Sequence, residues 1–582
     1  MAGFVGIYGS AVLEMKADVA KAVDLTIYSA KTTKRILRED SNLILHESYF
    51  PLLQAGINHA VSGDVHAWFT GEVYHINELN VPSGALFCDR LLANYQSNNL
   101  DRFLSGINGI YNGIIYDKHK HELLIITDRY GLKPLYLSGN NGVCILASEL
   151  KCFAQFKAFD LTIRKEVVEP FIELQHFMGS ETWLKNVEVA APSTIYTFKL
   201  DSGSLSSRRY WSWNMIQRSS LSFDEAAFEM GRLLEVVNNE RFESNSRVGV
   251  ALSGGLDSRA ILAAVRNGNP VTYTFGTDNS DDVAIAKRVT KLAKVKHVHF
   301  NTYADNWLTE RFTGVWKTDG MLNMLHMHYS HLMDAIAGIM DINLSGFLGD
   351  AVLGGSYLEK KGNVALNTRI NAATARRYYG RHFERCDLND PYFDIDKIDP
   401  YLFYNRGRRM IGMGAEEPYK TTPQRLPFMD NRLMDLSYSL PDEYRVHSKV
   451  YNAALLRNYS AFYKDIPHAT TGVPISENPT LVNLGLKMIN RAKWILKYKL
   501  GMQTSYVNVH NWILQPDAAS FISSALDPRK ALYREFTTKD FHALYFIPHH
   551  KRRANFVREI MGALTFEIWL QQILNGKLIA EE

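Results

Sequence analysis

The stretch Ser253-Gly254-Gly255-Leu256-Asp257-Ser258 decides the fold of the longer half of the chain. An apolar run, 248–252, precedes it and is the right length for one buried β-strand. Good helix formers follow it over 259–265. The order strand, tight glycine turn and helix start directs backbone N–H groups and the positive end of a helix at one point. This arrangement suits a phosphate or pyrophosphate group.

The residue types in this turn also favour phosphate binding. Gly254 and Gly255 allow positive φ and a close approach of an anion to the backbone. Ser253 and Ser258 can donate hydroxyl hydrogen bonds. Asp257 would repel a bare phosphate, so its presence indicates a bound cation, most simply Mg²⁺.

The turn is not a Walker loop, because no Gly-Lys-Ser or Gly-Lys-Thr ends it. It resembles the SGGxDS loop of the ATP pyrophosphatase (PP-loop) superfamily, which splits ATP between its α- and β-phosphates and adenylates a substrate. The resemblance implies ATP and Mg²⁺ as cofactors. We also expect nucleotide contacts at Ala251, Leu256 and Phe275. The alternative is a glycine-rich helix start without a ligand.

Composition sets the broad class. The chain has 582 residues, 46% of them hydrophobic, which predicts two to four domains with large cores. A net charge of +4 is too mild to indicate a nucleic-acid partner. Four scattered cysteines without a CxxC pair favour a reducing, cytoplasmic setting. No run of about 18 apolar residues occurs, so we expect no membrane partner. The longest candidate, 321–340, is predicted to be a buried helix.

Residues 1–215 are rich in short apolar runs separated by turn residues, which predicts a layered α+β domain. Four stretches, in order, resemble the glutaminase domain of class B asparagine synthetases, which has an N-terminal-nucleophile (Ntn) hydrolase fold. They are Met1–Gly9, Phe69–Tyr74, Asp128–Tyr136 and Ala147–Lys151.

The sequence departs from that family at the residues that the family uses to hydrolyse glutamine. Ala2 stands where the family has its cysteine nucleophile, and a methyl group cannot attack an amide. Thr70 replaces the asparagine that stabilises the oxyanion, and 45–50 lacks the substrate-clamping H-R-G-P-D segment. We therefore expect a degenerate, inactive glutaminase-like domain, a loss that beta-lactam synthetases share.

The second predicted domain, 222–582, follows a link near 213–221. Ser222 and Glu225 form a capping-box pattern for a first helix. Alternating strands and helices then predict a doubly wound parallel sheet, followed by a helical C-terminal part. His297 and His299 share one face of a strand, and we interpret them as packing residues rather than a metal site.

A second chemical segment, Leu344–Gly355, resembles the family's L-S-G-x-x-x-D-x-x-x-G-G pattern. The resemblance implies that Ser345 and Gly346 contact adenosine and that Asp350 completes the Mg²⁺ site with Asp257. Phe347 departs from the family, where this position is Glu in asparagine synthetases and Tyr in beta-lactam synthetases. A capping Asp in a glycine-rich turn is the alternative.

Two further segments resemble the family. Arg425–Leu433 matches R-x-P-F-x-D-x-R-L and would form either an acyl-substrate pocket or a buried ion-pair network. The segment 466–474 resembles the closing loop, whose usual lysine stabilises charge during amine attack. That lysine is absent at 469–471, so we nominate Lys449 or Arg457 as catalytic cations, with Lys464 also open.

Together these features predict an asparagine-synthetase-like ligase that adenylates a small-molecule or peptide carboxylate and joins it to an amine. Three alternatives stay open. One is an intramolecular cyclase, like beta-lactam synthetases or lasso-peptide cyclases. Another is a nucleotide-binding pseudo-enzyme. The last is another PP-loop enzyme, which would lack the long front domain. The amine donor and a homodimer are also left open.

Overall fold

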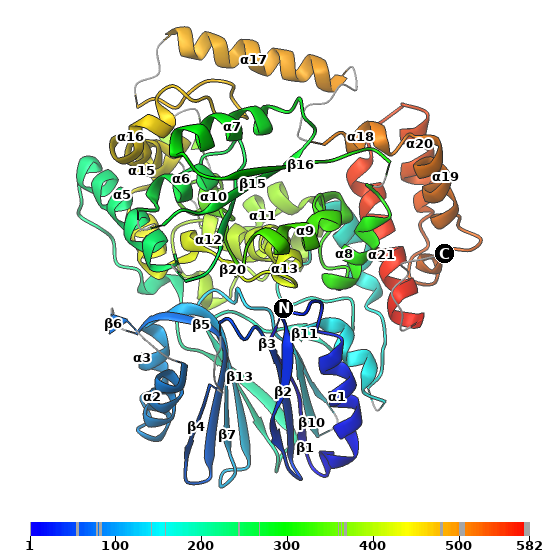
Figure 1. Ribbon diagram of the computed structural model, residues 1–582. Helices are drawn as coiled ribbons and strands as arrows, with labels where there is room; N and C mark the ends of the chain where they lie inside the picture. Colours follow the sequence, from blue (N-terminus) through cyan, green and yellow to red (C-terminus); the bar gives the residue numbers. More distant parts are fainter. Residues whose placement is uncertain are drawn as a thin grey trace.

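The computed structural model describes residues 2–53, 58–76, 79–80, 84–140, 142–157, 159–242, 245–266, 268–305, 307–358, 360–361, 364–365, 369–477, 481–499 and 507–575. Two parts lie one above the other (Figure 1). The lower part contains the N-terminal strands, and the upper part contains a parallel sheet surrounded by helices. Within the described ranges, no helix has the length and apolar composition that a membrane crossing needs.

The N-terminal part contains two antiparallel sheets. One has the order β11-β9-β10-β1-β3-β2, and the other has the order β13-β12-β8-β7-β5-β4 with β6 paired to β5. The strands are β1 (Phe4–Gly9), β2 (Thr33–Glu39), β3 (Leu43–Tyr49), β4 (His59–Ser62), β5 (Val65–Ile76), β6 (Leu79–Asn80), β7 (Ile107–Asp117), β8 (Glu122–Thr127), β9 (Tyr136–Asn140), β10 (Val143–Ala147), β11 (Glu188–Val189), β12 (Thr194–Lys199) and β13 (Ser204–Arg209).

These two sheets face each other across an apolar core. Phe4 and Tyr8 from one sheet meet Trp68, Ile114 and Phe198 from the other, all of them buried. Helix α1 (Lys16–Asp24) covers the outer face of the first sheet, and α2 (Gly84–Gln96) and α3 (Leu100–Ser105) lie on the side of the second (Figure 1). This helix–sheet–sheet–helix layering confirms the predicted α+β, Ntn-hydrolase-like class.

The second part is built on a parallel sheet of order β16-β15-β14-β17-β20. Its strands are β14 (Val248–Ala251), β15 (Val271–Gly276), β16 (His297–Asn301), β17 (Ile342–Leu344) and β20 (Gln424–Arg425). Because the chain runs outward from β14 to β16 and then returns to the other side of β14, the strand order reverses between β14 and β17. Ligands bind at such a switch point in doubly wound folds. The predicted fold class is confirmed.

Three helices follow the predicted pattern. Helix α5 (Phe223–Glu240) begins with the capping box, in which Glu225 N–H donates to Ser222 Oγ and Ser222 N–H donates to the Glu225 carboxylate. Helices α6 (Asp257–Ala264) and α7 (Asp281–Ala293) follow β14 and β15. The predicted helix over 321–340 is wrong, because this stretch forms two 3₁₀ turns and only then α9 (Met333–Ile339).

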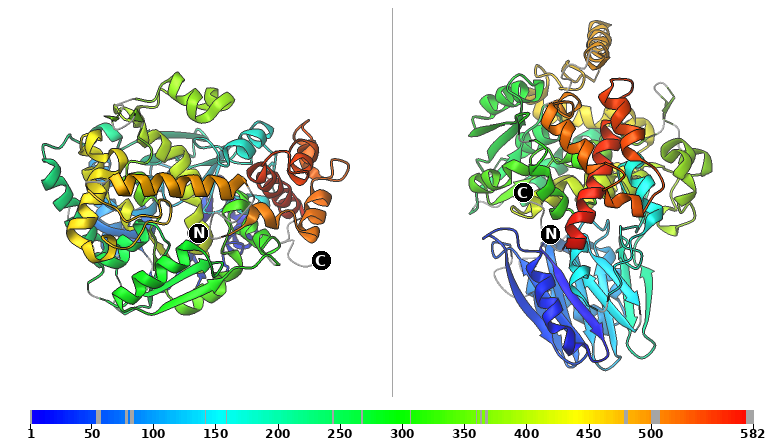
Figure 2. Two further views of the ribbon diagram at one scale, coloured as in Figure 1. Left: turned by 90° about the horizontal axis from the view of Figure 1, so that it is seen from above. Right: turned by 90° about the vertical axis from the view of Figure 1, so that its right-hand side faces the viewer.

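Most of the remaining helices lie around the parallel sheet, and those of 507–575 form one side of the molecule (Figures 1 and 2). They are α4 (Val168–Leu174), α8 (Glu310–Lys317), α10 (Gly349–Val352), α11 (Ala372–Tyr379), α12 (Asp399–Leu402), α13 (Met413–Tyr419), α14 (Asn431–Ser439), α15 (Asp442–Arg445), α16 (Lys449–Tyr463), α17 (Leu481–Lys499), α18 (Val509–Trp512), α19 (Pro516–Ala525), α20 (Ile547–His550) and α21 (Val557–Asn575). A π-helix, Phe403–Ile411, joins α12 to α13.

The family-like segments of the first part lie at its contact with the second. The N–H groups of Leu150 and Lys151 donate to the carboxylate of Asp319 at 2.7 and 3.0 Å. The Lys420 ammonium forms an ion pair with Glu149 at 2.6 Å. The four charged side chains here are almost fully buried: Glu149, Lys151, Asp319 and Lys420. These residues therefore hold the two parts together, whatever their part in chemistry.

Candidate functional site

A cavity of about 640 Å³ lies at the carboxyl ends of β14 and β17, at the switch point. Its size is within the usual range for small-molecule sites. The walls come from the loop after β14, the loop after β17, α11 and the π-helix. The lining residues are Ala251, Ser253, Gly255, Asp257, Ser258, Ser345, Gly346, Phe347, Leu348, Asp350, Ala351, Ser356, Tyr357, Tyr378, Arg406 and Ile411.

The glycine turn is held by its own serines. Ser253 N–H donates to Ser258 Oγ at 3.0 Å, and Gly255 N–H donates to Ser253 Oγ at 3.2 Å. Gly254 N–H donates instead to Asp282 Oδ1 on α7, at 2.9 Å. The predicted cradle of amides is therefore divided, with Ser253 and Gly255 beside the cavity while Gly254 contacts α7.

Two aspartates from distant segments meet in this cavity. Asp350 N–H donates to Asp257 Oδ2 at 2.9 Å, and the Tyr451 hydroxyl donates to Asp257 Oδ1 at 3.0 Å. Burial and the nearby Asp350 carboxylate raise the pKa of Asp257 to about 7, and burial also raises the pKa of Asp350. Two adjoining carboxylates that resist ionisation together form a favourable place for a cation.

The donor set fits Mg²⁺, a hard ion that prefers oxygen ligands and commonly binds through one or two carboxylates. Among the described residues, no group of three or more His, Cys, Asp or Glu side chains gathers as metal ligands. The remaining coordination positions would then be filled by water and phosphate oxygens, as is usual for this ion.

Glycines allow the two loops to touch. A Cβ on Gly349 would stand 2.6 Å from Asp257 Cγ, and one on Gly346 would stand 2.9 Å from Ser258 N. Leu348, between them, has a φ of 69°, in the left-handed region. Such strain in a non-glycine residue is typical of functional sites. The backbone of the second loop therefore packs directly against the first.

The segment 466–474, expected as a closing loop, packs on the glycine turn. Ala469 N–H donates to the Gly254 carbonyl at 3.1 Å. The buried Arg259 guanidinium donates to the carbonyls of Gly254, Ile466 and Pro467 at 3.2, 3.2 and 2.9 Å. The structure thus brings this segment to the site, although it carries no lysine at 469–471.

The nominated cations lie elsewhere. Arg457 forms ion pairs with Asp224 and Glu477 at 2.9 and 3.0 Å, and it does not line the cavity. Lys449 is exposed at the start of α16 and does not line it either. Among the described residues that line the cavity, the cationic side chain is Arg406, from the π-helix.

Of the other residues predicted to contact the nucleotide, some line the cavity and some do not. Ala251, Ser345 and Gly346 line the cavity, whereas Leu256 and Phe275 do not. The Phe275 ring packs on Tyr329 instead, with 5.3 Å between ring centroids.

For 425–433 the structure favours the ion-pair network over a substrate pocket. Arg425 donates to the Glu72 carboxylate at 2.6 Å, and Arg241 pairs with Asp430 at 2.6 Å, with both arginines nearly inaccessible to water. Asn108 also donates to Asp430, at 2.8 Å. The Arg425–Glu72 and Asn108–Asp430 contacts cross between the two parts, whereas the Arg241–Asp430 pair lies within the second part. None of these residues lines the cavity.

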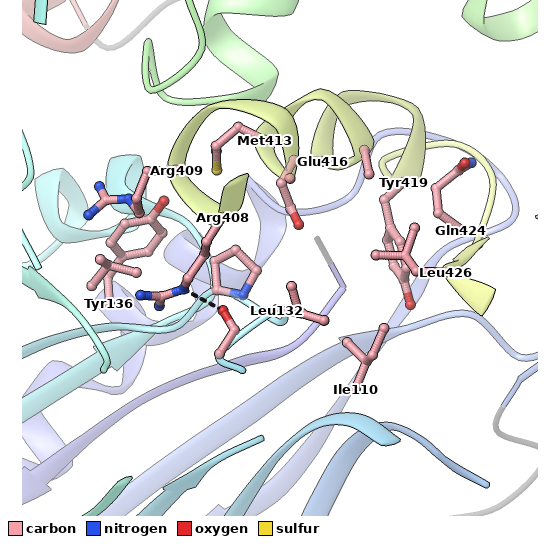
Figure 3. Close-up of a pocket in the computed structure, with 15 residues that line it drawn as sticks. Ile110, Leu132, Tyr136, Arg408, Arg409, Met413, Glu416, Tyr419, Gln424 and Leu426 are labelled. Atoms are coloured by element: carbon pink, nitrogen blue, oxygen red, sulfur yellow. Dashed lines mark hydrogen bonds between the residues drawn. The ribbon is translucent and has the colours of Figure 1, made fainter. Parts of the chain in front are cut away.

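A second cavity, of about 40 Å³, lies between the two parts (Figure 3). Ile110 and Leu132 contribute from the first part, and Met413 and Leu426 from the second. The Glu416 side chain points into it, and burial raises the pKa of Glu416. This space holds a water-sized molecule and not a nucleotide.

Sequence comparisons match a known family model to each half of the chain. A model of the glutamine amidotransferase domain matches residues 62–211, and one of asparagine synthase matches residues 229–389. The glutamine-hydrolyzing asparagine synthetase 1 of Bacillus subtilis is 24% identical over 525 residues, 76% of this chain and 82% of that protein.

Shorter matches agree. A Mycobacterium tuberculosis protein named "Putative asparagine synthetase [glutamine-hydrolyzing]" is 26% identical over 275 residues, 43% of this chain and 41% of its own. That match spans about two fifths of the relative's length. The "Amidase chyE" of Penicillium rubens is 25% identical over 295 residues, 45% of this chain and 42% of its own. With an amidotransferase-like domain followed by an asparagine synthase domain, the chain belongs to the asparagine synthetase-like family.

Proposed function

We propose that this protein is an ATP-dependent, AMP-forming ligase that activates a carboxylate and joins it to an amine. The observation that carries the proposal is the meeting of Asp257 and Asp350 in the cavity beside the glycine turn, at the switch point of the sheet. A triphosphate with its divalent cation is the ligand whose charge and shape match that arrangement.

The proposed reaction has two steps. A substrate carboxylate oxygen attacks the α-phosphorus of ATP, the bond from that phosphorus to the bridging oxygen breaks, and pyrophosphate leaves. The amine nitrogen then attacks the acyl carbon, the bond to the phosphate oxygen breaks, AMP leaves, and the amine loses a proton. Bound Mg²⁺ would neutralise phosphate charge.

The chain's own residues would position these groups. Asp257 and Asp350 would hold the cation, while Ser253, Gly255 and Ser258 would contact phosphate oxygens. Hydrogen-bond donors fixed before the reaction stabilise developing charge without reorganisation. Arg406 offers a positive charge in the cavity lining and would take the place of the family's closing-loop lysine.

We infer that the protein has no glutaminase of its own. The space beside Ala2 and Thr70 measures about 10 Å³, room for about one water, and Phe50, Leu53 and Tyr419 line it. The Lys133 ammonium donates to the Ala2 carbonyl. A glutamine side chain does not fit there, so the amine would come from free ammonia or from an amine substrate.

The proposal includes the setting predicted from the sequence, a reducing compartment such as the cytoplasm. Cys88, Cys144 and Cys152 are buried as free thiols, which supports that setting. A small-molecule or peptide carboxylate is the expected substrate, and no nucleic acid is needed.

An intramolecular cyclase is the second candidate. Phe347 lines the cavity, and its ring can neither ionise nor donate a proton, which favours a substrate other than aspartate. A pseudo-enzyme is the third, favoured by the missing lysine at 469–471 and disfavoured by the intact aspartate pair.

The test is release of pyrophosphate from ATP with a panel of carboxylates, with and without amines. We expect release that is lost in Asp257→Ala and kept in Asp201→Ala, an exposed aspartate far from the cavity. Mass spectrometry then separates the candidates, because a cyclase yields one product lighter by one water. ATP binding without pyrophosphate release for any acid would leave the pseudo-enzyme.

A further inference from the structure

Helix α17 (Leu481–Lys499) turns its apolar face toward solvent. Leu481, Met488 and Ile495 recur every seven residues, and so do Val482, Ile489 and Leu496, so these six side chains share one broad face. The exposed fractions show that this apolar face is open to solvent: Leu481 is 87% exposed, Met488 74%, Val482 69% and Leu496 58%.

The polar side of the same helix faces the protein. Asn490 Nδ2 donates to the Thr471 carbonyl at 3.1 Å. A Cβ on Gly472 would stand 2.5 Å from Asn490 Nδ2, so this contact is close. A surface helix of a globular protein normally does the opposite and buries its apolar stripe. A contiguous exposed apolar face of this kind marks a binding surface.

The charge of the helix narrows the choice of partner. Lys487, Arg491, Lys493 and Lys497 lie along it, and the sequence 481–499 contains no Asp or Glu. The partner surface must therefore be both apolar and anionic. A nucleic acid would satisfy the cations but leave the apolar face in water.

Position and shape favour a flat partner. Helix α17 is the outermost element at the end of the molecule opposite the N-terminal sheets, set apart from the helices beneath it (Figures 1 and 2). Its 19 residues span about 28 Å. A plane can therefore contact the helix along its whole length without meeting the rest of the protein.

We propose that α17 docks the protein on an anionic lipid bilayer, lying in the interface with its apolar face among the acyl chains and its cations at the headgroups. Apolar area and attraction to anionic lipid together drive such binding. This revises the prediction of no membrane partner, which rested on the lack of a spanning segment. An interfacial helix needs none.

Docking would also orient the site. Asn490 contacts the segment 466–474, and that segment contacts Gly254 in the glycine turn. The bound protein would thus hold its ATP cavity near the lipid surface. The proposal does not depend on which reaction the cavity performs.

The test is co-sedimentation of the full chain with vesicles of phosphatidylglycerol and phosphatidylcholine, compared with vesicles of phosphatidylcholine alone. We expect binding to the anionic vesicles that weakens as salt increases. Met488→Asp should weaken it about tenfold or more, because it places a charge in the apolar face. Lys493→Glu with Lys497→Glu should weaken it about 25-fold or more, from roughly fivefold for each cation lost.

Two matched controls lie on other helices. Phe228→Asp changes a residue of α5 that is 64% exposed, and Lys291→Glu changes an exposed lysine of α7. Both should bind like the unmodified protein, and all variants should keep its melting temperature because the altered side chains are exposed.

Absence of binding to anionic vesicles at low salt overturns the proposal. So does equal weakening by the α5 and α7 controls. A dimer in solution that Met488→Asp converts to a monomer, without any vesicle binding, would assign the face to a second copy of the chain instead.

Discussion

Replacing Gly349 by alanine tests the central geometry with a single methyl group. The added Cβ would lie 2.6 Å from Asp257 Cγ and 2.9 Å from Asp257 Oδ1. Carbon atoms in contact prefer about 3.5–4.0 Å. The Asp257 carboxylate must therefore retreat by about 1 Å or the second loop must move away from it. A misplacement of about 1 Å costs on the order of 100-fold in rate, or about 2.7 kcal/mol of transition-state stabilisation.

The assay is exchange of labelled pyrophosphate into ATP in the presence of a carboxylate that supports pyrophosphate release, measured at several Mg²⁺ concentrations. We expect Gly349→Ala to lower the exchange rate about 100-fold and to require more Mg²⁺. The matched control is Gly338→Ala in α9, another helical glycine, where an added Cβ meets nothing within 4 Å. It should keep full exchange and gain a little stability. A folded Gly349→Ala protein with unchanged exchange and Mg²⁺ dependence would refute the role given to the Asp257–Asp350 pair.

Three further predictions concern Arg406, Ala2 and Glu240. Arg406→Ala should lower pyrophosphate exchange about tenfold or more, and Arg406→Lys should lower it less; a larger loss in Arg457→Ala would instead support the assignment made from the sequence. Ala2→Cys should leave glutamine hydrolysis at background, since the space beside it is about 10 Å³, and measurable ammonia release would contradict this. Burial opposes the ionisation of Glu240, but hydrogen bonds from His75 and Arg432 lower its pKa to about 2. A lowered carboxyl pKa stabilises the folded state above the ordinary pKa and loses that effect as pH falls toward 2. Because Glu240 is exposed and water screens its ion pairs, Glu240→Gln should cost about 1 kcal/mol at pH 7 and a few tenths of a kcal/mol less at pH 4 in denaturant unfolding.

The sequence was most informative where local chemistry specifies local structure. The strand, glycine turn and helix around 253–258 match β14 and α6 within two residues, because a glycine pair and a buried apolar run leave few alternatives. The capping box of Ser222 is present as predicted. The parallel doubly wound sheet followed from alternating strands and helices.

Contacts between residues far apart in the chain could not be predicted from the sequence. Tyr451 reaches Asp257 across 194 residues, and no local pattern connects them. Arg406 was missed because a π-helix, rare in any sequence, sets the direction of its side chain.

The helix predicted over 321–340 failed for a reason that lies in its polar residues. The Asn323 side chain accepts from Leu325 N–H at 2.9 Å and starts a new turn. Ser330 Oγ lies within donating distance of the Met327 carbonyl, at 3.2 Å, and of the buried Glu417 carboxylate. Polar side chains that bond to nearby backbone compete with the helix ladder, and the apolar residues around them conceal that competition.

The contact around Glu149 has a consequence for any attempt to separate the halves. Glu149, Lys151, Asp319 and Lys420 balance one another's charges in surroundings without water. A ligase half expressed alone would keep Asp319 and Lys420 but lose both of their counterions. That separated half would also open to water the surface on which Leu150 and Lys151 now lie. The front domain, inactive as a catalyst in our proposal, would therefore still supply the charges that balance Asp319 and Lys420 and the surface that covers them.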